Sequence, residues 1–247
     1  MRLTVVGCSG SFPGPDSPAS CYLVEHEGHA VLLDLGNGAL GPLQRHIGLY
    51  DVDAVVLSHL HVDHCIDLAS YYVARKYCPE GPAPRLPVLG PPGTADRMAR
   101  AYDLPATPGM HAEFDFRDHV EVCEVGPFRL TTAVVNHPVP TFAVRVEAGG
   151  RSLVYSGDTG PSPALVSLAR GADLALTEAS FLERDSNPPD LHLTAAQAAG
   201  HALEAGVGRL VLTHLVAWNP VAESQAEAAA RFDGELHVAR AGLTLEV

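Results

Sequence analysis

Four side chains that can bind metal ions lie within six residues, in the segment Ser58-His59-Leu60-His61-Val62-Asp63-His64. The segment follows a predicted strand over 54–57 and precedes a predicted helix that begins near Ile66. Histidines two apart at a strand end can turn their imidazoles to one side, while Asp63 and His64 can face a second position beside it. A solvated polar loop rarely contains such a string, so we interpret it as a metal-binding motif.

Three further candidate ligands are isolated in the sequence, and each comes just after a short apolar run that we predict to be a strand: His137, Asp158 and His214. Taken singly, each is a weak signal, because a lone histidine at a strand end is more often an ordinary surface residue. A mixed sheet places such strand ends along one edge. All seven side chains can therefore converge on one cleft.

The seven candidates offer imidazole and carboxylate but no thiolate, a set that favours zinc, manganese or iron. Five of the seven are histidines, so we expect two divalent ions with zinc as the first choice. A shared carboxylate can hold two such ions about 3.5–4 Å apart. The five cysteines match none of these positions and form no CxxC pair, which suits buried thiols in a reducing cytoplasm.

Short apolar runs rich in β-branched residues predict the strands that position these ligands. They cover 3–6, 30–33, 54–57, 130–135, 142–146, 153–155, 174–176 and 210–212. Helices are expected over 66–77, 93–102, 162–169, 195–205 and 221–231. The clearest helix starts at Thr194, where Gln197 completes a capping box, and stops at Gly206.

Strands come first and then alternate with helices, in both halves of the chain. This order predicts an α/β fold with two mixed sheets packed face to face and helices outside, a four-layer αββα sandwich. At 247 residues, one domain over 1–247 is expected. The proline-rich stretch 79–110 is predicted to be a surface excursion with one helix.

The formal net charge of −13 disfavours broad docking onto a polyanion. A local site could still bind one phosphate if metal ions supply the positive charge. The N-terminus lacks the pattern of a signal peptide, and no segment approaches the ~20 apolar residues of a membrane span. We therefore expect a cytoplasmic protein with no membrane partner.

These motifs resemble the metallo-β-lactamase superfamily along almost the whole chain. HLHVDH fits the superfamily pattern HxHxDH, and LLDLG at 32–36, His137, SGDTG at 156–160 and THL at 213–215 follow in the family's order. The resemblance implies a first metal held by His59, His61 and His137, and a second held by Asp63, His64 and His214. It assigns Asp158 as the bridging ligand. It also implies that Asp34 orients the motif through hydrogen bonds.

Two more segments resemble ribonuclease Z and its phosphodiesterase relatives: Thr177-Glu178-Ala179-Ser180 and the helix start after Leu191-His192-Leu193-Thr194. In those enzymes the histidine, supported by the glutamate, faces the scissile phosphate. An imidazole held by a carboxylate can stay protonated and give its proton to an alkoxide leaving group. We therefore predict His192 and Glu178 as catalytic residues. Asp63, one of the predicted metal ligands, is also predicted to be catalytic.

Two departures from the ribonuclease Z pattern narrow the substrate. Only 20 residues separate His137 from Asp158, so the long basic arm that grips tRNA is absent, and Asp67 stands where a glycine usually ends the motif. The opening segment GCSGSFPGPDSPAS and the later LLDLGNGALGPLQRH resemble actinobacterial phosphodiesterases that degrade cyclic nucleotides. We expect a small phosphodiester, with cyclic AMP as the lead substrate, attacked by a metal-bound hydroxide.

Several alternatives stay open. The chain could be a reduced ribonuclease Z that trims tRNA 3′ ends, or a thioester or lactone hydrolase of the same fold. Trp218 could contact a base or ring of the substrate, and core packing is an equal alternative. The glycine- and serine-rich loop over 7–20 could bring backbone amides near a phosphate or simply connect two strands. The resemblance also makes a homodimer reasonable.

Overall fold

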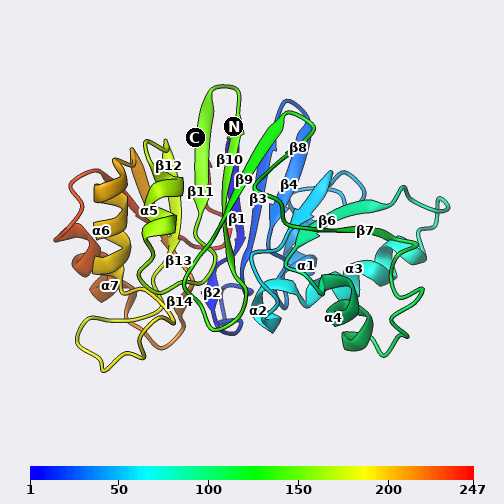
Figure 1. The fold of residues 1–247 in the computed structure, drawn as a ribbon, viewed down its shortest axis with the longest axis horizontal. Helices are drawn as coiled ribbons and strands as arrows, with labels where there is room; N and C mark the ends of the chain where they lie inside the picture. The colour runs from blue at the N-terminus through cyan, green and yellow to red at the C-terminus, as the bar shows by residue number, and fades with distance from the viewer.

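Two seven-stranded sheets pack face to face between two layers of helices in the computed structural model, which describes all 247 residues (Figure 1). The predicted four-layer αββα sandwich is confirmed. The first sheet has the order β16 (Thr244–Glu246), β1 (Arg2–Gly7), β3 (Cys21–His26), β4 (His29–Leu33), β5 (Ala54–Val56), β6 (Leu86–Gly90) and β7 (Phe114–Asp118).

The second sheet has the order β15 (Glu235–Val238), β13 (Arg209–Thr213), β12 (Leu174–Glu178), β11 (Arg151–Tyr155), β10 (Phe142–Ala148), β9 (Phe128–Val134) and β8 (Val122–Val125). Strands β11, β12, β13 and β15 run parallel, so their carboxyl ends lie along one edge. A separate parallel pair, β2 (Ser9–Gly10) and β14 (Leu215–Val216), lies at that same end of the sandwich (Figure 1).

Helices cover the outer face of each sheet. The first sheet is covered by α1 (Leu40–Leu43), α2 (Val62–Cys65), α3 (Asp67–Lys76) and α4 (Thr94–Ala101), and the second by α5 (Pro163–Ala169), α6 (Ala195–Ala205) and α7 (Val221–Ala229). The five helices predicted from sequence correspond to α3 to α7. The capping box at the start of α6 is present, since the Thr194 and Gln197 side chains each accept the other's backbone N–H at 2.9–3.1 Å.

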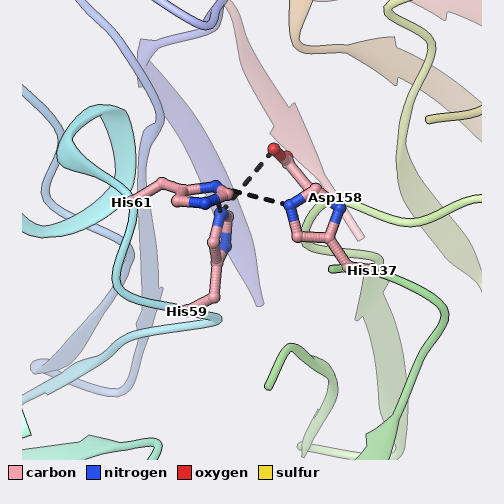
Figure 2. A group of neighbouring side chains, drawn as sticks. All are labelled: His59, His61, His137 and Asp158. Atoms are coloured by element: carbon pink, nitrogen blue, oxygen red, sulfur yellow. Dashed lines mark hydrogen bonds and ion pairs between the residues drawn. The ribbon is translucent and has the colours of Figure 1, made fainter. Parts of the chain in front are cut away.

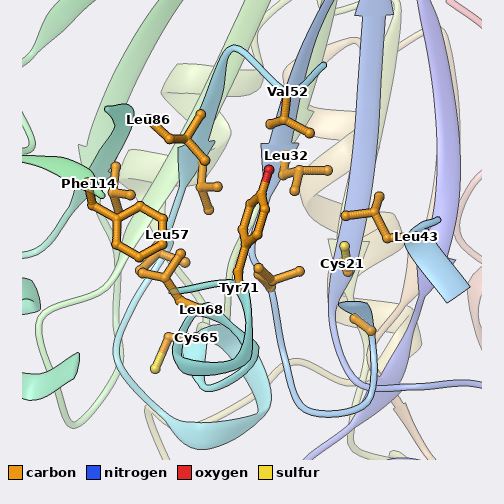
Figure 3. Packing of buried hydrophobic residues seen from close by; sticks show 14 of the residues in the cluster. Cys21, Leu32, Leu43, Val52, Leu57, Cys65, Leu68, Tyr71, Leu86 and Phe114 are labelled. Carbon is orange, nitrogen blue, oxygen red and sulfur yellow. The ribbon is translucent and has the colours of Figure 1, made fainter. Parts of the chain in front are cut away.

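Three apolar layers hold the sandwich together, because successive strand residues point to opposite faces. In β4, the Leu32 side chain points to the helix-covered face of the first sheet and belongs to the same apolar cluster as Tyr71 of α3 and Phe114 of β7 (Figure 3). The side chains of Val31 and Leu33 point to the second sheet. The third layer joins the second sheet to the alanine-rich face of α6. This packing fixes the strand ends that carry the polar residues.

The prediction for 79–110 is wrong in part. Besides helix α4, this stretch contains β6, which lies between β5 and β7 inside the first sheet. Pro87 lacks an N–H, yet β5 pairs only with Val88 and Leu89, so the proline does not interrupt that ladder. No helix of the chain is long and apolar enough to cross a bilayer.

Candidate metal centre

The seven predicted ligands meet at one end of the sandwich, in loops that follow strand ends. The motif at 59–64 comes from the loop after β5 and from α2, and His137 comes from the turn between β9 and β10. Asp158 and His214 follow the parallel strands β11 and β13. Two groups of four side chains have ligand atoms within 4.8 Å of one another, and Asp158 belongs to both.

The first group contains His59, His61, His137 and Asp158 (Figure 2). His61 Nδ1 lies 2.9 Å from His59 Nε2 and 3.4 Å from His137 Nε2. An oxygen of Asp158, Oδ2, lies 3.7 Å from His59 Nε2. Three ring nitrogens and one carboxylate oxygen therefore surround a single point.

The second group contains Asp63, His64, His214 and Asp158. His214 Nε2 lies 3.2 Å from His64 Nε2 and 3.1 Å from Asp63 Oδ2. The other oxygen of Asp158, Oδ1, lies 3.2 Å from His64 Nε2 and 3.5 Å from His214 Nε2. The two oxygens of Asp158 thus face different groups, which is the arrangement of a bridging carboxylate.

The ring tautomers direct lone pairs into the centre. A carboxylate or carbonyl only accepts, so His64 Nδ1–H donates to Asp34 at 2.7 Å and His137 Nδ1–H donates to the Leu191 carbonyl at 2.9 Å. Ser180 Oγ–H donates to the His214 carbonyl at 2.9 Å, which lets His214 Nδ1–H donate to Ser180 Oγ at 2.8 Å. In each ring, when neutral, Nε2 is then the nitrogen that can coordinate a metal ion.

These donor atoms fit divalent cations. Burial lowers the pKa of His59, His61 and His137, which keeps their rings neutral and able to coordinate. Asp158 Oδ1 is buried and receives no hydrogen bond. A buried carboxylate oxygen without a hydrogen bond needs a positive partner, and imidazole and carboxylate are suitable ligands for zinc.

Asp34 is a hydrogen-bond acceptor that connects several side chains next to the metal centre. It is fully buried and accepts from Ser58 N at 2.6 Å, Ser58 Oγ at 2.8 Å, His64 Nδ1 at 2.7 Å and Tyr155 Oη at 2.7 Å. Ser58 Oγ in turn lies 3.0 Å from His59 Nδ1. The hydrogen-bonding role expected for Asp34 agrees with this geometry. Sequence reasoning did not assign a role to Ser58 or Tyr155, although both lie just before ligand motifs.

The position of His214 depends on a close approach between its backbone and that of the segment around Gly10. Its φ of 57° is left-handed, and a Cβ added to Gly10 would meet the His214 carbonyl oxygen at 2.3 Å. Ser11 N lies 3.3 Å from His214 Nε2, while the amides of Cys8 and Ser9 donate to the Pro18 carbonyl. The loop over 7–20 therefore uses most of these amides internally and supports His214.

His192 and Glu178 form a pair beside the centre. His192 Nδ1 donates to Glu178 Oε1 at 2.8 Å and lies 4.0 Å from Asp158 Oδ2. The fully buried Glu178 also accepts from Thr159 N at 2.9 Å and Ser180 N at 3.1 Å. Burial by itself would lower the pKa of His192, but the hydrogen bond and negative charge of Glu178 raise it above its ordinary value.

Asp67 lies outside this arrangement. Its Oδ2 accepts from Leu40 N at 2.8 Å, and it is the first residue of α3. The carboxylate thus joins α1 to α3 instead of entering the metal centre. The first-turn position also suits a negative charge at the positive end of the helix.

Comparisons with known proteins identify the family to which this chain is similar. A family model described as a beta-lactamase superfamily domain matches residues 29–215. An uncharacterized protein of Mycobacterium leprae is 41% identical over 257 residues, spanning 100% of this chain and 89% of that protein. The ribonuclease Z of Mycobacterium bovis is 34% identical over 270 residues, spanning 96% of this chain and 95% of that enzyme. The crystal structure of the metallo-beta-lactamase fold protein YhfI from Bacillus subtilis has a TM-score of 0.89 and 28% identity, covering 99% of each chain.

Proposed function

Because the chain belongs to the metallo-β-lactamase superfamily, we propose that it is a two-metal phosphodiesterase that hydrolyses a small phosphodiester, with cyclic AMP as the lead substrate. The metal ligands of this proposal are His59, His61 and His137 for one ion and Asp63, His64 and His214 for the other, with Asp158 shared. Zinc is the first choice because five of the seven are histidines.

The paired Glu178 and His192 carry the proposal. Hydrolysis of an alkyl phosphodiester expels an alkoxide, which needs a proton from a general acid. Hydrolysis of a thioester expels a thiolate, which does not need one. His192 reaches the edge of the centre with Nδ1 bound to Glu178 at 2.8 Å, so its other nitrogen, Nε2, is available to protonate the departing 3′ oxygen. The relative named ribonuclease Z, a name that denotes action on RNA, adds support.

Two divalent cations bound by the seven ligands would supply a water of lowered pKa and neutralise charge that develops on the phosphoryl oxygens. The chain's own residues orient ligands and supply a proton. Asp34 and Ser180 hold ligand rings in the tautomers that leave Nε2 free. Glu178 is held by two backbone amides and in turn fixes the orientation of His192.

Two features favour a small substrate over a folded RNA. Residues 138–157 form only a turn and the hairpin of β10 and β11, with no additional arm. The net charge of −13 opposes a polyanion that contacts the protein at many phosphates. A substrate with a single phosphate needs no additional arm, and the two metal ions would supply the positive charge that attracts it.

A ribonuclease Z-like endonuclease that acts on tRNA 3′ ends is the second candidate, because a relative so named is 34% identical over nearly the whole chain. Binding through several backbone phosphates would make tRNA affinity fall steeply with salt. A weak salt dependence, or no tRNA binding, argues for the small substrate.

The test compares four substrates on one metal-loaded preparation: cyclic AMP, a 2′,3′-cyclic nucleotide, a 3′-extended tRNA and a lactone. We expect the highest kcat/KM on cyclic AMP, because the centre accepts one phosphate and His192 protonates an alkoxide. Preference for the tRNA would support the endonuclease instead. Preference for the lactone would refute the phosphodiesterase proposal, because His192 could then protonate the alkoxide of an ester.

A further inference from the structure

A cavity of about 370 Å³ opens beside the metal centre, and none of the seven metal ligands lines it. Its lining includes His192 and, farther along the chain, Trp218, so one bound molecule can touch both. The volume is in the range of sites for small ligands. Through His192, the cavity adjoins the position proposed for the scissile phosphate.

Trp218 is 70% exposed, and it is the only tryptophan in the chain. Core packing, one of the two roles considered for it, is wrong. Together with Phe12, which is 37% exposed and whose ring lies 5.1 Å away, Trp218 forms a contiguous aromatic patch beside the active centre, and such patches mark ligand-binding surfaces. Its indole can stack on a planar ring at little entropic cost, since few torsions need to be fixed.

The fold holds this tryptophan close to the metal ligands. Strands β2 and β14 pair with each other. Phe12 comes just after β2, and Trp218 comes just after β14. The rings of Phe12 and Trp218 are 5.1 Å apart with an interplanar angle of 39°. Phe12 does not line the cavity, so it supports the indole from outside. The same strand pair contacts His214, four residues before Trp218.

Charge and polarity indicate what the cavity accepts. None of its lining residues is a lysine or arginine, and Asp185 contributes a negative charge, so a second phosphate would be unfavourable. The nearby Arg184 is paired with Glu223 at 3.2 Å. Asn187 and Asn219 each donate from Nδ2 to a backbone carbonyl at 2.8 Å, which orients the amides and leaves their Oδ1 atoms as acceptors. A neutral ring that bears an amino group suits this lining.

We propose that Trp218, supported by Phe12, is the stacking surface for the nucleobase of the substrate, and thereby determines specificity for a nucleotide over other phosphodiesters. This inference rests on the proposed function for its substrate class. Stacking on an aromatic side chain tolerates different bases, because every base has a π-face. Preference among bases then comes from the amide oxygens of Asn187 and Asn219.

The first measurement is binding, followed by tryptophan fluorescence, which reports on Trp218 alone. Metal-loaded protein is titrated with 5′-AMP and with ribose 5-phosphate, which carry the same phosphate and differ by the base. We expect quenching by 5′-AMP and much less by ribose 5-phosphate. Equal responses to both would overturn the stacking site, whether or not the protein hydrolyses cyclic AMP.

The second measurement is turnover of cyclic AMP and of its abasic analogue, a ribose 3′,5′-cyclic phosphate with a methyl group in place of the base. Trp218→Ala should lower kcat/KM on cyclic AMP by about ten- to a hundredfold and leave the analogue's value close to that of the unmutated protein. Trp218→Phe should restore most of the loss. The matched control is Tyr77→Ala, since Tyr77 is 69% exposed and lies outside this cavity.

Equal losses on both substrates in Trp218→Ala, or no loss on either, would refute the role of Trp218 while leaving the phosphodiesterase proposal intact. Quenching by 5′-AMP without hydrolysis of any phosphodiester would support the base site and refute the proposed reaction.

Discussion

Replacing Asp158 with asparagine is expected to lower kcat/KM on cyclic AMP by about a thousandfold or more. Asp158 is the one side chain common to both ligand groups, with Oδ2 facing His59 and Oδ1 facing His64. A bound metal contributes several kcal/mol of transition-state stabilisation, and each step of about 1.4 kcal/mol is tenfold in rate. The neutral amide of asparagine cannot bridge two cations.

Metal content distinguishes this effect from misfolding. We expect Asp158→Asn to bind one ion or none per chain, measured on folded protein with an unchanged circular dichroism spectrum. Asp67→Asn is the matched control, because it makes the same chemical change at a nearby carboxylate that contacts Leu40 N and belongs to neither ligand group. Retention of two ions and normal turnover by Asp158→Asn would refute the bridging role.

Replacing His192 with alanine is expected to reduce turnover in a way that depends on the leaving group. On cyclic AMP, whose 3′ oxygen leaves as an alkoxide, kcat should fall by about 10²- to 10⁴-fold, the range typical of a lost general acid. On bis(p-nitrophenyl) phosphate the loss should be less than about tenfold, because nitrophenolate barely needs a proton. Steady-state kinetics on both substrates give the comparison.

His201→Ala is the matched control for His192. His201 lies on α6, a few residues beyond His192, and its ring hydrogen-bonds only to the backbone of Ser162 and Gln197. Both substrates should be turned over normally by this variant. Equal losses on cyclic AMP and the nitrophenyl ester in His192→Ala would mean that His192 positions the substrate or the metals and does not act as the acid.

The dense part of the centre was predictable because it is local. His59, His61, Asp63 and His64 lie within one short segment, and the strand before it is a clear apolar run. His137, Asp158 and His214 required the additional inference that strand ends share an edge. The parallel register of β11, β12 and β13 provides that edge for Asp158 and His214.

The supporting residues were harder to predict, because their roles depend on contacts between distant segments. Tyr155 donates to Asp34 across 121 positions of the chain, and Ser180 contacts His214 across 34. No local pattern distinguishes these hydroxyl groups from others. Trp218 was equally ambiguous in sequence, since exposure is a property of the folded surface.

Edge strands were also missed. β7, with the sequence FDFRD, and β15, with ELHV, carry exposed or half-buried polar residues and have no continuous apolar run. Each pairs on one side only, at the edge of its sheet. Their strand conformation follows from pairing with a neighbour more than from their own composition.

The most direct test is elemental analysis of purified, active protein, with the number of divalent ions per chain measured before and after chelation. The account predicts two ions per chain, zinc foremost, with hydrolysis lost when they are removed and regained when they return. Full hydrolytic activity in protein that contains no bound divalent ion would contradict it.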